Sequence, residues 1–171
     1  IAPFNYSYET MPPLERMSMM MNHELVHIAT MDKPSPADKF FRGVFSGKVA
    51  PIAEAPLSML YANLSSPRWN SPRWFIEGIA VFLETWMGGG LGRAQGSYDE
   101  MVFRTMVRDS AYFYDVVGLE SEAVKVDFQV GANSYLYGTR FVSYLALKHG
   151  PEKLIAWFRQ NEESKSRLDR K

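Results

Sequence analysis

Residues 23–27 read His-Glu-Leu-Val-His, which is the pattern H-E-x-x-H. Because residues four apart lie on one face of a helix, His23 and His27 can direct both imidazoles at one metal ion. Glu24 stands beside the first histidine, where its carboxylate can take a proton from a water on that metal. Zinc lowers the pKa of such a water to about 7. The pattern therefore predicts a zinc site that includes His23 and His27, with Glu24 as its general base.

The helix that carries this pattern is predicted over residues 14–30, ending before Pro34. Apolar residues cover nearly every side of it, so we expect the helix to be buried. Its broadest apolar face consists of Leu14, Met17, Met21, Leu25, Ile28 and Ala29. The alternative is a surface helix that carries the pattern by chance. Burial argues against it, because two imidazoles and a carboxylate are costly in a core unless something satisfies them.

A third zinc ligand must come from elsewhere, because catalytic zinc usually has three protein ligands and a water. His149 is the only other histidine in the chain. It lies in Lys-His-Gly-Pro at residues 148–151, which reads as a helix end with a glycine cap and a proline stop. A cationic side chain is ordinary there, so His149 is the weaker candidate.

Glu77 is the stronger candidate for the third ligand. We predict that its helix is capped by Ser71 and has Pro72 in the first helical position. The apolar stripe of this helix consists of Phe75, Ile76, Ile79, Phe82, Leu83 and Trp86. The opposite face carries Arg73, Glu77 and Glu84. That face is either solvated or bears a ligand. Gly78 costs about 1 kcal/mol relative to alanine inside a helix, so we expect another element to approach closely there.

The segment at residues 74–80, Trp-Phe-Ile-Glu-Gly-Ile-Ala, resembles the W-x-x-E-G-x-A segment of gluzincin zinc metallopeptidases, in the peptidase MA-like superfamily. That clan includes thermolysin-type and aminopeptidase-type catalytic domains. The resemblance implies that Glu77 is the third zinc ligand. It also implies that Glu84 accepts an imidazole N–H and so fixes the tautomer of a ligand. The G-A-M-E-N-type segment of the aminopeptidases is missing from the chain, which argues against aminopeptidase activity.

A tyrosine segment at residues 134–141 resembles the Y-x-x-G segment of the aminopeptidase-type enzymes. The resemblance implies a tyrosine hydroxyl that donates a hydrogen bond to the oxyanion of the tetrahedral intermediate. Two tyrosines compete for this role. Tyr137 shares a helical stripe with Phe141, Tyr144 and Leu145, which predicts that it lies in the core. Tyr135 lies off that stripe and is our candidate, although it can also serve only in packing.

The predicted fold class is mainly α, a helical zincin (thermolysin-like) catalytic domain with little or no remnant of the N-terminal sheet. We expect one domain over residues 1–171, as a piece of a longer chain, and a strand remnant at residues 4–8. Gly-rich residues 88–92 are predicted to form a flexible loop. Further helices are expected near residues 36–41, 52–61, 98–108, 119–126, 131–148 and 152–161.

Composition narrows the classes of function. The chain has 171 residues, of which 46% are hydrophobic, so it can bury a sizeable core. Its 19 basic and 19 acidic residues cancel, and no basic patch indicates a nucleic-acid partner. No apolar stretch is long enough for a membrane span. With no cysteine, thiol chemistry and disulfides are excluded. For the compartment we favour a bacterial extracytoplasmic one.

These features together predict zinc-dependent hydrolysis of peptide bonds by a metal-activated water, with a peptide or protein as substrate. Zn²⁺ is the expected cofactor. One alternative is a non-catalytic zinc-binding module derived from a peptidase, which would have no need of Glu24 or Tyr135. Another is an oxygen-using iron protein, because two histidines and a carboxylate also suit ferrous iron. A di-iron bundle would need a second Glu-x-x-His motif, and the chain has one.

Overall fold

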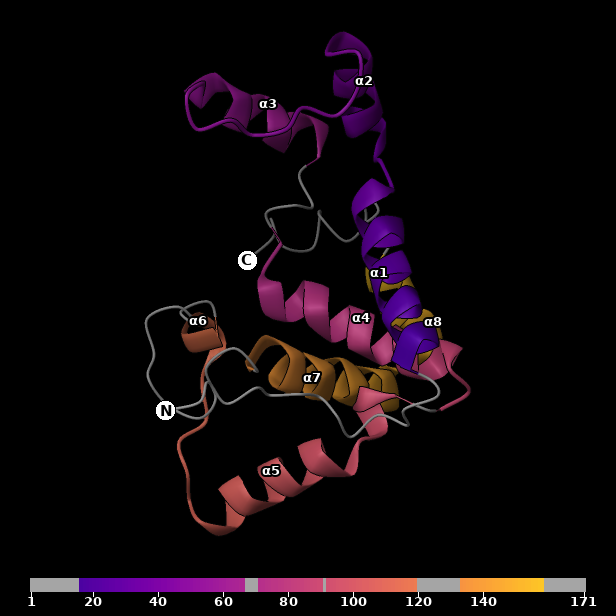
Figure 1. The fold of residues 1–171 in the computed structure, drawn as a ribbon, viewed down its shortest axis with the longest axis vertical. Coiled ribbons are helices and arrows are strands. Elements are labelled where there is room, and N and C mark those ends of the chain that lie inside the picture. Colours follow the sequence, from indigo (N-terminus) through magenta and orange to yellow (C-terminus); the bar gives the residue numbers. More distant parts are fainter. Residues whose placement is uncertain (1–15, 67–70, 91, 120–132, 159–171) are drawn as a thin grey trace. The chain divides into compact units, whose positions relative to one another are not determined.

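The described part of the computed structural model, residues 16–66, 71–90, 92–119 and 133–158, is mainly helical (Figure 1). This confirms the mainly α class. Within these ranges the only β-type pairing is an isolated bridge between Ile52 and Ala55. The expected strand at residues 4–8 lies outside the described residues. The elements are α1 (Arg16–Asp32), α2 (Pro36–Val44), α3 (Pro56–Ser65), α4 (Arg73–Met87), the 3₁₀ turn η2 (Arg93–Gln95), α5 (Ser97–Arg108), α6 (Val116–Leu119), α7 (Asn133–His149) and α8 (Pro151–Phe158).

The chain divides into two compact units. Unit 1 consists of residues 1–26 and 72–150, and unit 2 consists of residues 27–71 and 151–171. The division falls inside α1, so the two ends of that helix belong to different units. Among the described residues, no helix combines the length and the apolar character that crossing a bilayer requires.

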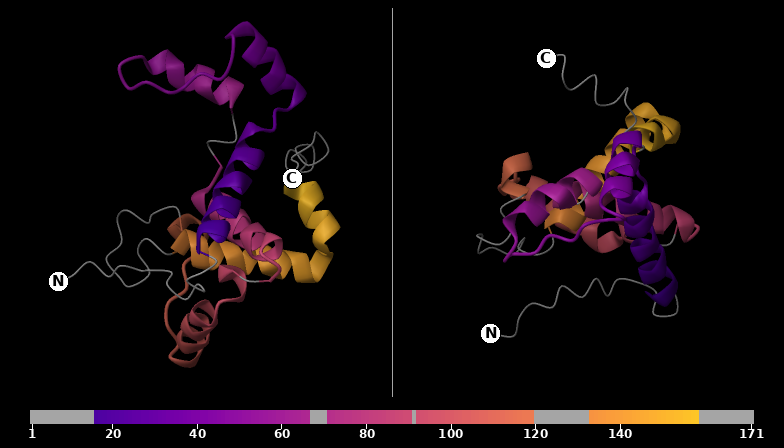
Figure 2. Two further views of the ribbon diagram at one scale, coloured as in Figure 1. Left: turned by 45° about the vertical axis from the view of Figure 1, so that its right-hand side comes forward. Right: turned by 90° about the horizontal axis from the view of Figure 1, so that it is seen from above.

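The central element of unit 1 is the pair of helices α4 and α7, which run side by side in Figures 1 and 2. Two glycines allow their backbones to touch. A Cβ on Gly78 would overlap the backbone of Gly138, and a Cβ on Gly138 would overlap the carbonyl oxygen of Trp74. The close approach that we expected at Gly78 is therefore confirmed, and α7 is the element that makes it.

Helix α4 is buried over most of its circumference. Ile79, Ala80, Val81, Phe82, Glu84 and Thr85 are all buried. The interpretation of its polar face as a solvated one is therefore wrong at Glu84. Two local predictions are also wrong. Pro72, not Ser71, occupies the cap position, because the carbonyl of Pro72 accepts from the amides of Phe75 and Ile76. Trp86, in the last turn of α4, is exposed rather than part of the buried stripe.

Helix α1 begins and ends two residues later than its predicted range. The expectation that it is buried on nearly every side is wrong, because only one narrow stripe of it is buried. The buried residues of the helix are Met19, His23 and Val26, which follow the i, i+4, i+7 spacing of one narrow stripe. The broad apolar face is exposed at Met17, Met21, Leu25, Ile28 and Ala29. Leu14 lies outside the described residues. The face of α1 that is packed inside is thus the face that carries His23.

In unit 2, α2 and α3 form the two short helices predicted in the connector. Ser35 caps α2 through a capping box, in which Ser35 Oγ accepts from the amide of Asp38 and the Asp38 carboxylate accepts from the amide of Ser35. A hydrogen bond links the two helices: Nε of Arg42 in α2 donates to the carbonyl of Ser65 at the end of α3. In unit 1, α5 and α7 lie within two residues of their predicted ranges. The helix predicted at 119–126 lies outside the described residues except for Leu119, and the short helix α6 that ends there was not predicted.

Candidate metal centre

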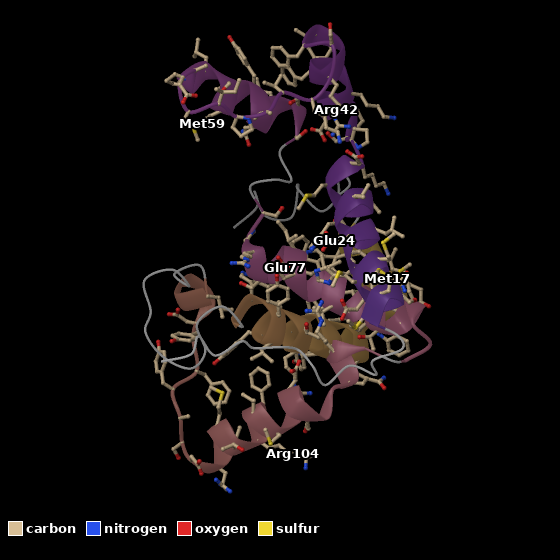
Figure 3. The ribbon with its side chains drawn as sticks, viewed as in Figure 1. Met17, Glu24, Arg42, Met59, Glu77 and Arg104 are labelled. Carbon is tan, nitrogen blue, oxygen red and sulfur yellow. The ribbon has the colours of Figure 1, made fainter. Side chains whose placement is uncertain are left out.

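His23 stands between two carboxylates of α4. Its side chain is buried, with a relative exposure of 8%. Nδ1 lies 2.7 Å from Oε2 of Glu84, and Nε2 lies 3.2 Å from Oε2 of Glu77. The two glutamates are seven residues apart, which is about two helical turns and therefore the same face of α4. Figure 3 labels Glu77 on α4 and Glu24 on α1. The resemblance named Glu77 as a metal ligand and Glu84 as an acceptor from an imidazole, and the structure places both carboxylates beside His23.

His27 lies one turn beyond His23 on the same helix, so helix geometry places the two rings on one face although the division of units falls between them. His23, His27 and Glu77 each offer one ligand atom, and these atoms all lie within 4.8 Å of one another. Zinc bonds of about 2.0–2.2 Å at a tetrahedral angle put neighbouring ligand atoms about 3.3 Å apart. The 3.2 Å between His23 and Glu77 matches that spacing, and the ligand atom of His27 lies within 4.8 Å of both. Two imidazoles and a carboxylate are ligand types that zinc accepts.

Glu24 differs from its neighbour His23 in its exposure. The residue is exposed, whereas His23 beside it is buried, and it does not belong to the group of ligand atoms. A group that takes protons from water needs access to water and must not be consumed as a ligand. The placement of Glu24 satisfies both conditions. Its function as a base stays a prediction.

Glu84 is fully buried and carries three short hydrogen bonds. Its Oε2 accepts from Nδ1 of His23 at 2.7 Å and from Nη2 of Arg93 at 2.7 Å, and its Oε1 accepts from Nε of Arg93 at 2.8 Å. Burial alone would raise the pKa of Glu84, but the hydrogen bonds from Arg93 and His23 outweigh burial and lower it. The carboxylate is therefore ionised, and it holds the imidazole by the nitrogen that faces away from Glu77.

The same interactions act on His23. Burial lowers the pKa of this imidazole, while the hydrogen bonds to Glu77 and Glu84 raise it and the positive charge of Arg93 lowers it; the net result is a raised pKa. With a proton on each nitrogen, the ring donates to both carboxylates. Binding of a cation requires Nε2 to lose its proton, whereas Nδ1 keeps its proton and its bond to Glu84.

Arg93 is the residue of this site that the sequence did not reveal. It comes from the 3₁₀ turn η2, which follows the glycine-rich loop, and its side chain is 10% exposed. Nη2 also lies 2.8 Å from Nδ1 of His23. When Nδ1 carries the proton, Nδ1 of His23 and Nη2 of Arg93 lie close together because both donate to Oε2 of Glu84. No helical spacing connects a loop arginine to a glutamate nine residues earlier, so periodicity gave no signal for it.

Asp99 is a second charged residue that the sequence did not reveal. It lies in the first turn of α5 and is half-buried. Burial raises its pKa to about 6, against the opposing attraction of Arg93 and Arg140, and the charge of Glu84 adds to the increase. The charges of Arg93 and Glu84 therefore both affect the pKa of Asp99.

The two candidate tyrosines occupy different places in unit 1. The Tyr135 ring lies 6.2 Å from the His23 ring, nearly parallel to it, with an interplanar angle of 27°. The guanidinium carbons of Arg73 and Arg93 lie 5.8 and 5.3 Å, respectively, from the centre of the Tyr135 ring. Burial and the negative charge of Glu77 raise the pKa of Tyr135, and its hydroxyl also forms hydrogen bonds with Arg73 and Glu77. The Tyr135 hydroxyl therefore keeps its proton at neutral pH.

Tyr137 packs instead in an aromatic cluster. Its ring lies 5.2 Å from that of Phe103 and 6.3 Å from that of Phe113, and its hydroxyl accepts from the amide of Tyr114 at 3.4 Å. We predicted that Tyr137, Phe141, Tyr144 and Leu145 form one buried stripe of this helix. That prediction is wrong, because Phe141 and Tyr144 are exposed. The buried residues of α7 are Ser134, Leu136, Gly138, Thr139 and Val142.

His149 is the last residue of α7 and is exposed. Gly150 follows with a φ of +87°, and α8 begins at Pro151, as the sequence predicted. The group of possible ligands in the described residues does not include His149.

Comparisons of the chain with protein-family models, with curated proteins and with solved structures found no match. The resemblance to gluzincins thus depends on the motifs at residues 23–27, 74–80 and 134–141.

Proposed function

We propose that this protein is a zinc-dependent peptidase of the gluzincin type. One observation carries the proposal. The ligand atoms of His23, His27 and Glu77 lie within 4.8 Å of one another, although 50 positions separate His27 from Glu77 in the numbering. A chance H-E-x-x-H helix has no reason to meet the third ligand that the resemblance implies. In this proposal α1 and α4 correspond to the two zinc-binding helices of a thermolysin-like zincin.

Each residue of the site has a role in this proposal that fits its surroundings. His23, His27 and Glu77 would hold the ion. A zinc ion held there supplies Lewis acidity and lowers the pKa of a coordinated water to about 7. Exposed Glu24 accepts a proton from water and returns it to the leaving amine.

Two further groups prepare the site for this reaction. The Tyr135 hydroxyl, which keeps its proton, donates to the developing oxyanion. Buried Glu84 keeps the proton of His23 on Nδ1, so that Nε2 is the nitrogen available as a ligand.

The test combines metal analysis with a conservative variant. Protein purified without added metal is examined by mass spectrometry for zinc and iron, and then assayed on a library of quenched fluorescent peptides. We expect one zinc per chain and hydrolysis that falls by a factor of roughly 10² to 10⁴ in Glu24→Gln, the usual effect of losing a positioned general base. Zinc content should not change, since Glu24 is not among the ligands.

Three outcomes would contradict the proposal. Zinc without turnover on any peptide would favour the non-catalytic zinc-binding module. Iron in place of zinc would favour an oxygen-using protein. Hydrolysis that survives Glu24→Gln at a near-normal rate would show that another group takes the proton.

A further inference from the structure

We infer that Arg93 is a positioning residue of the metal centre: its guanidinium fixes the carboxylate of Glu84, which in turn holds the His23 imidazole in the orientation of a ligand. The inference deepens the proposed function and rests on it for the identity of the ion. It begins from the two Arg93–Glu84 hydrogen bonds of 2.8 and 2.7 Å, which use both carboxylate oxygens. Two parallel bonds fix the plane of a carboxylate, and a single bond does not.

Burial makes this pairing necessary. Glu84 is fully buried and Arg93 is only 10% exposed, so neither charge can be satisfied by bulk water. A buried carboxylate left with a single neighbour is strongly disfavoured. His23 supplies one hydrogen bond to Oε2 and none to Oε1. Arg93 supplies the bond to Oε1 and a second bond to Oε2, so Glu84 can remain ionised while it faces the imidazole.

The backbone that carries Arg93 is anchored to the same helix. The hydroxyl of Thr85, next to Glu84, accepts from the amide of Ala94 at 3.0 Å. A side chain at Gly92 would overlap Thr85, so the chain passes directly against α4 at this point. Residues on either side of Arg93 therefore contact the residue that follows Glu84. Gly92 and Ala94 thus hold the backbone of Arg93 against α4, next to Glu84.

Arg93 also contacts the candidate oxyanion donor. Its guanidinium carbon lies 5.3 Å from the centre of the Tyr135 ring, within the range of a cation–π interaction. The ring of Tyr135 in turn lies against His23. One guanidinium thus touches both the carboxylate behind His23 and the ring beside it, and its loss should disturb the orientation of the imidazole without removing a ligand.

The test measures zinc affinity directly, by competition with a chromophoric chelator at fixed pH. Arg93→Met should weaken zinc binding by a factor of about 10 to 100, the usual effect of losing a group that orients a ligand. Arg93→Lys keeps the charge but not the two-pronged geometry, so it should lie between wild type and Arg93→Met. Arg104→Met is the matched control. Arg104 also pairs with a glutamate, but it is exposed on the outside of α5 (Figure 3) and should have no effect.

A double-mutant cycle shows whether Arg93 acts through Glu84. The double variant Arg93→Met/Glu84→Gln should bind zinc no more weakly than Glu84→Gln alone, because the group that Arg93 orients has already been changed. Additive losses would overturn the inference. So would wild-type affinity in Arg93→Met. If Arg93→Met fails to fold, Arg93→Lys and the double variant, which leaves no unpaired buried charge at position 84, still give the comparison.

A measurement without metal separates this inference from the proposed function. In metal-free protein, ¹⁵N NMR of the imidazole should show the Nδ1 proton of His23 protected from exchange, and this protection should be lost in Arg93→Met but kept in Arg104→Met. If wild-type protein binds no zinc, the proposed function fails while the NMR comparison still stands. Protection that is unchanged in Arg93→Met would overturn the inference even if zinc binds.

Discussion

Glu77 and Glu84 lie two turns apart on α4 and accept from opposite nitrogens of the same imidazole, that of His23. The two carboxylates are alike in sequence context but different in surroundings. Glu84 is fully buried and held by Arg93, while the Glu77 side chain is 14% exposed and lies 3.8 Å from Arg73. This difference supports the roles that we propose, in which Glu77 binds the cation and Glu84 orients the histidine.

The first prediction separates the two candidates for the third ligand. Glu77→Ala should lower zinc affinity sharply, because a site with three protein ligands loses one of them. His149→Ala should leave zinc content unchanged, because that side chain is exposed at the end of α7. Equilibrium dialysis followed by metal analysis measures both. The reverse result would assign the chain to sites with three histidines.

The second prediction concerns Tyr135 and Tyr137. Tyr135→Phe removes one hydroxyl and almost no volume. If that hydroxyl donates to the oxyanion, kcat should fall by about 10² to 10³ with zinc retained. KM should change less, because the bond strengthens only as negative charge develops.

Tyr137→Phe is the control for that experiment. It loses a hydrogen bond of 3.4 Å to the amide of Tyr114, within the aromatic cluster that includes Phe103 and Phe113. We expect a loss of stability of about 1 kcal/mol and near-normal turnover. Steady-state kinetics together with thermal unfolding of both variants measure the contrast. Equal losses of kcat in the two variants would remove the basis for choosing Tyr135.

The third prediction tests the contact between α4 and α7. Gly78→Ala should destabilise the protein by about 1 to 3 kcal/mol, because the new methyl group overlaps the backbone of Gly138, which cannot move aside as a side chain would. Gly43→Ala in α2 is the control, since a Cβ there meets nothing within 4 Å. It should be neutral or stabilising by up to about 1 kcal/mol. Urea unfolding of both variants gives the comparison; an equally stable Gly78→Ala would show that the helices are further apart.

The fourth prediction is a pH dependence. The pKa of Asp99 rises on folding from 3.8 to about 6, so its contribution to stability is fully present below pH 4 and is lost as the pH rises through 6. Asp99→Asn does not ionise and is spared this loss. The stability of Asp99→Asn relative to wild type should therefore increase between pH 4 and pH 7, by at most about 3 kcal/mol. Denaturant unfolding at several pH values measures it. A difference that does not vary with pH would mean that Asp99 titrates normally.

The sequence predicted the parts of the site that have a helical spacing. His23 and His27 are one turn apart, which placed them on one face, and the resemblance added Glu77 and Glu84. The structure brings both glutamates to His23 and the ligand atoms of His23, His27 and Glu77 within 4.8 Å of one another, while their roles stay predictions. The position of α4 also followed from its apolar residues and Pro72, with an error of one residue at the cap.

What the sequence could not predict depends on the partners of each helix. Met17, Met21 and Leu25 are apolar and predict a buried face. Whether a face is buried depends on which elements pack against it, and in α1 the buried stripe is the one that contains His23. The sequence also gave no indication of Arg93, because its contacts depend on the tertiary fold. Its importance comes from a loop that folds back on α4, and no period in the chain relates it to Glu84.

The crossing of Gly78 and Gly138 has a consequence for how this protein can change over generations. Gly78 follows Glu77 directly, and Gly138 comes three residues after Tyr135. At the crossing the two backbones meet with no side chain between them, so the spacing of the helices there is independent of which apolar residues fill the rest of the interface. Random drift can alter the core volume elsewhere while Glu77 and Tyr135 keep their separation. The arrangement that the proposed chemistry needs is in this way protected from substitutions elsewhere in the core.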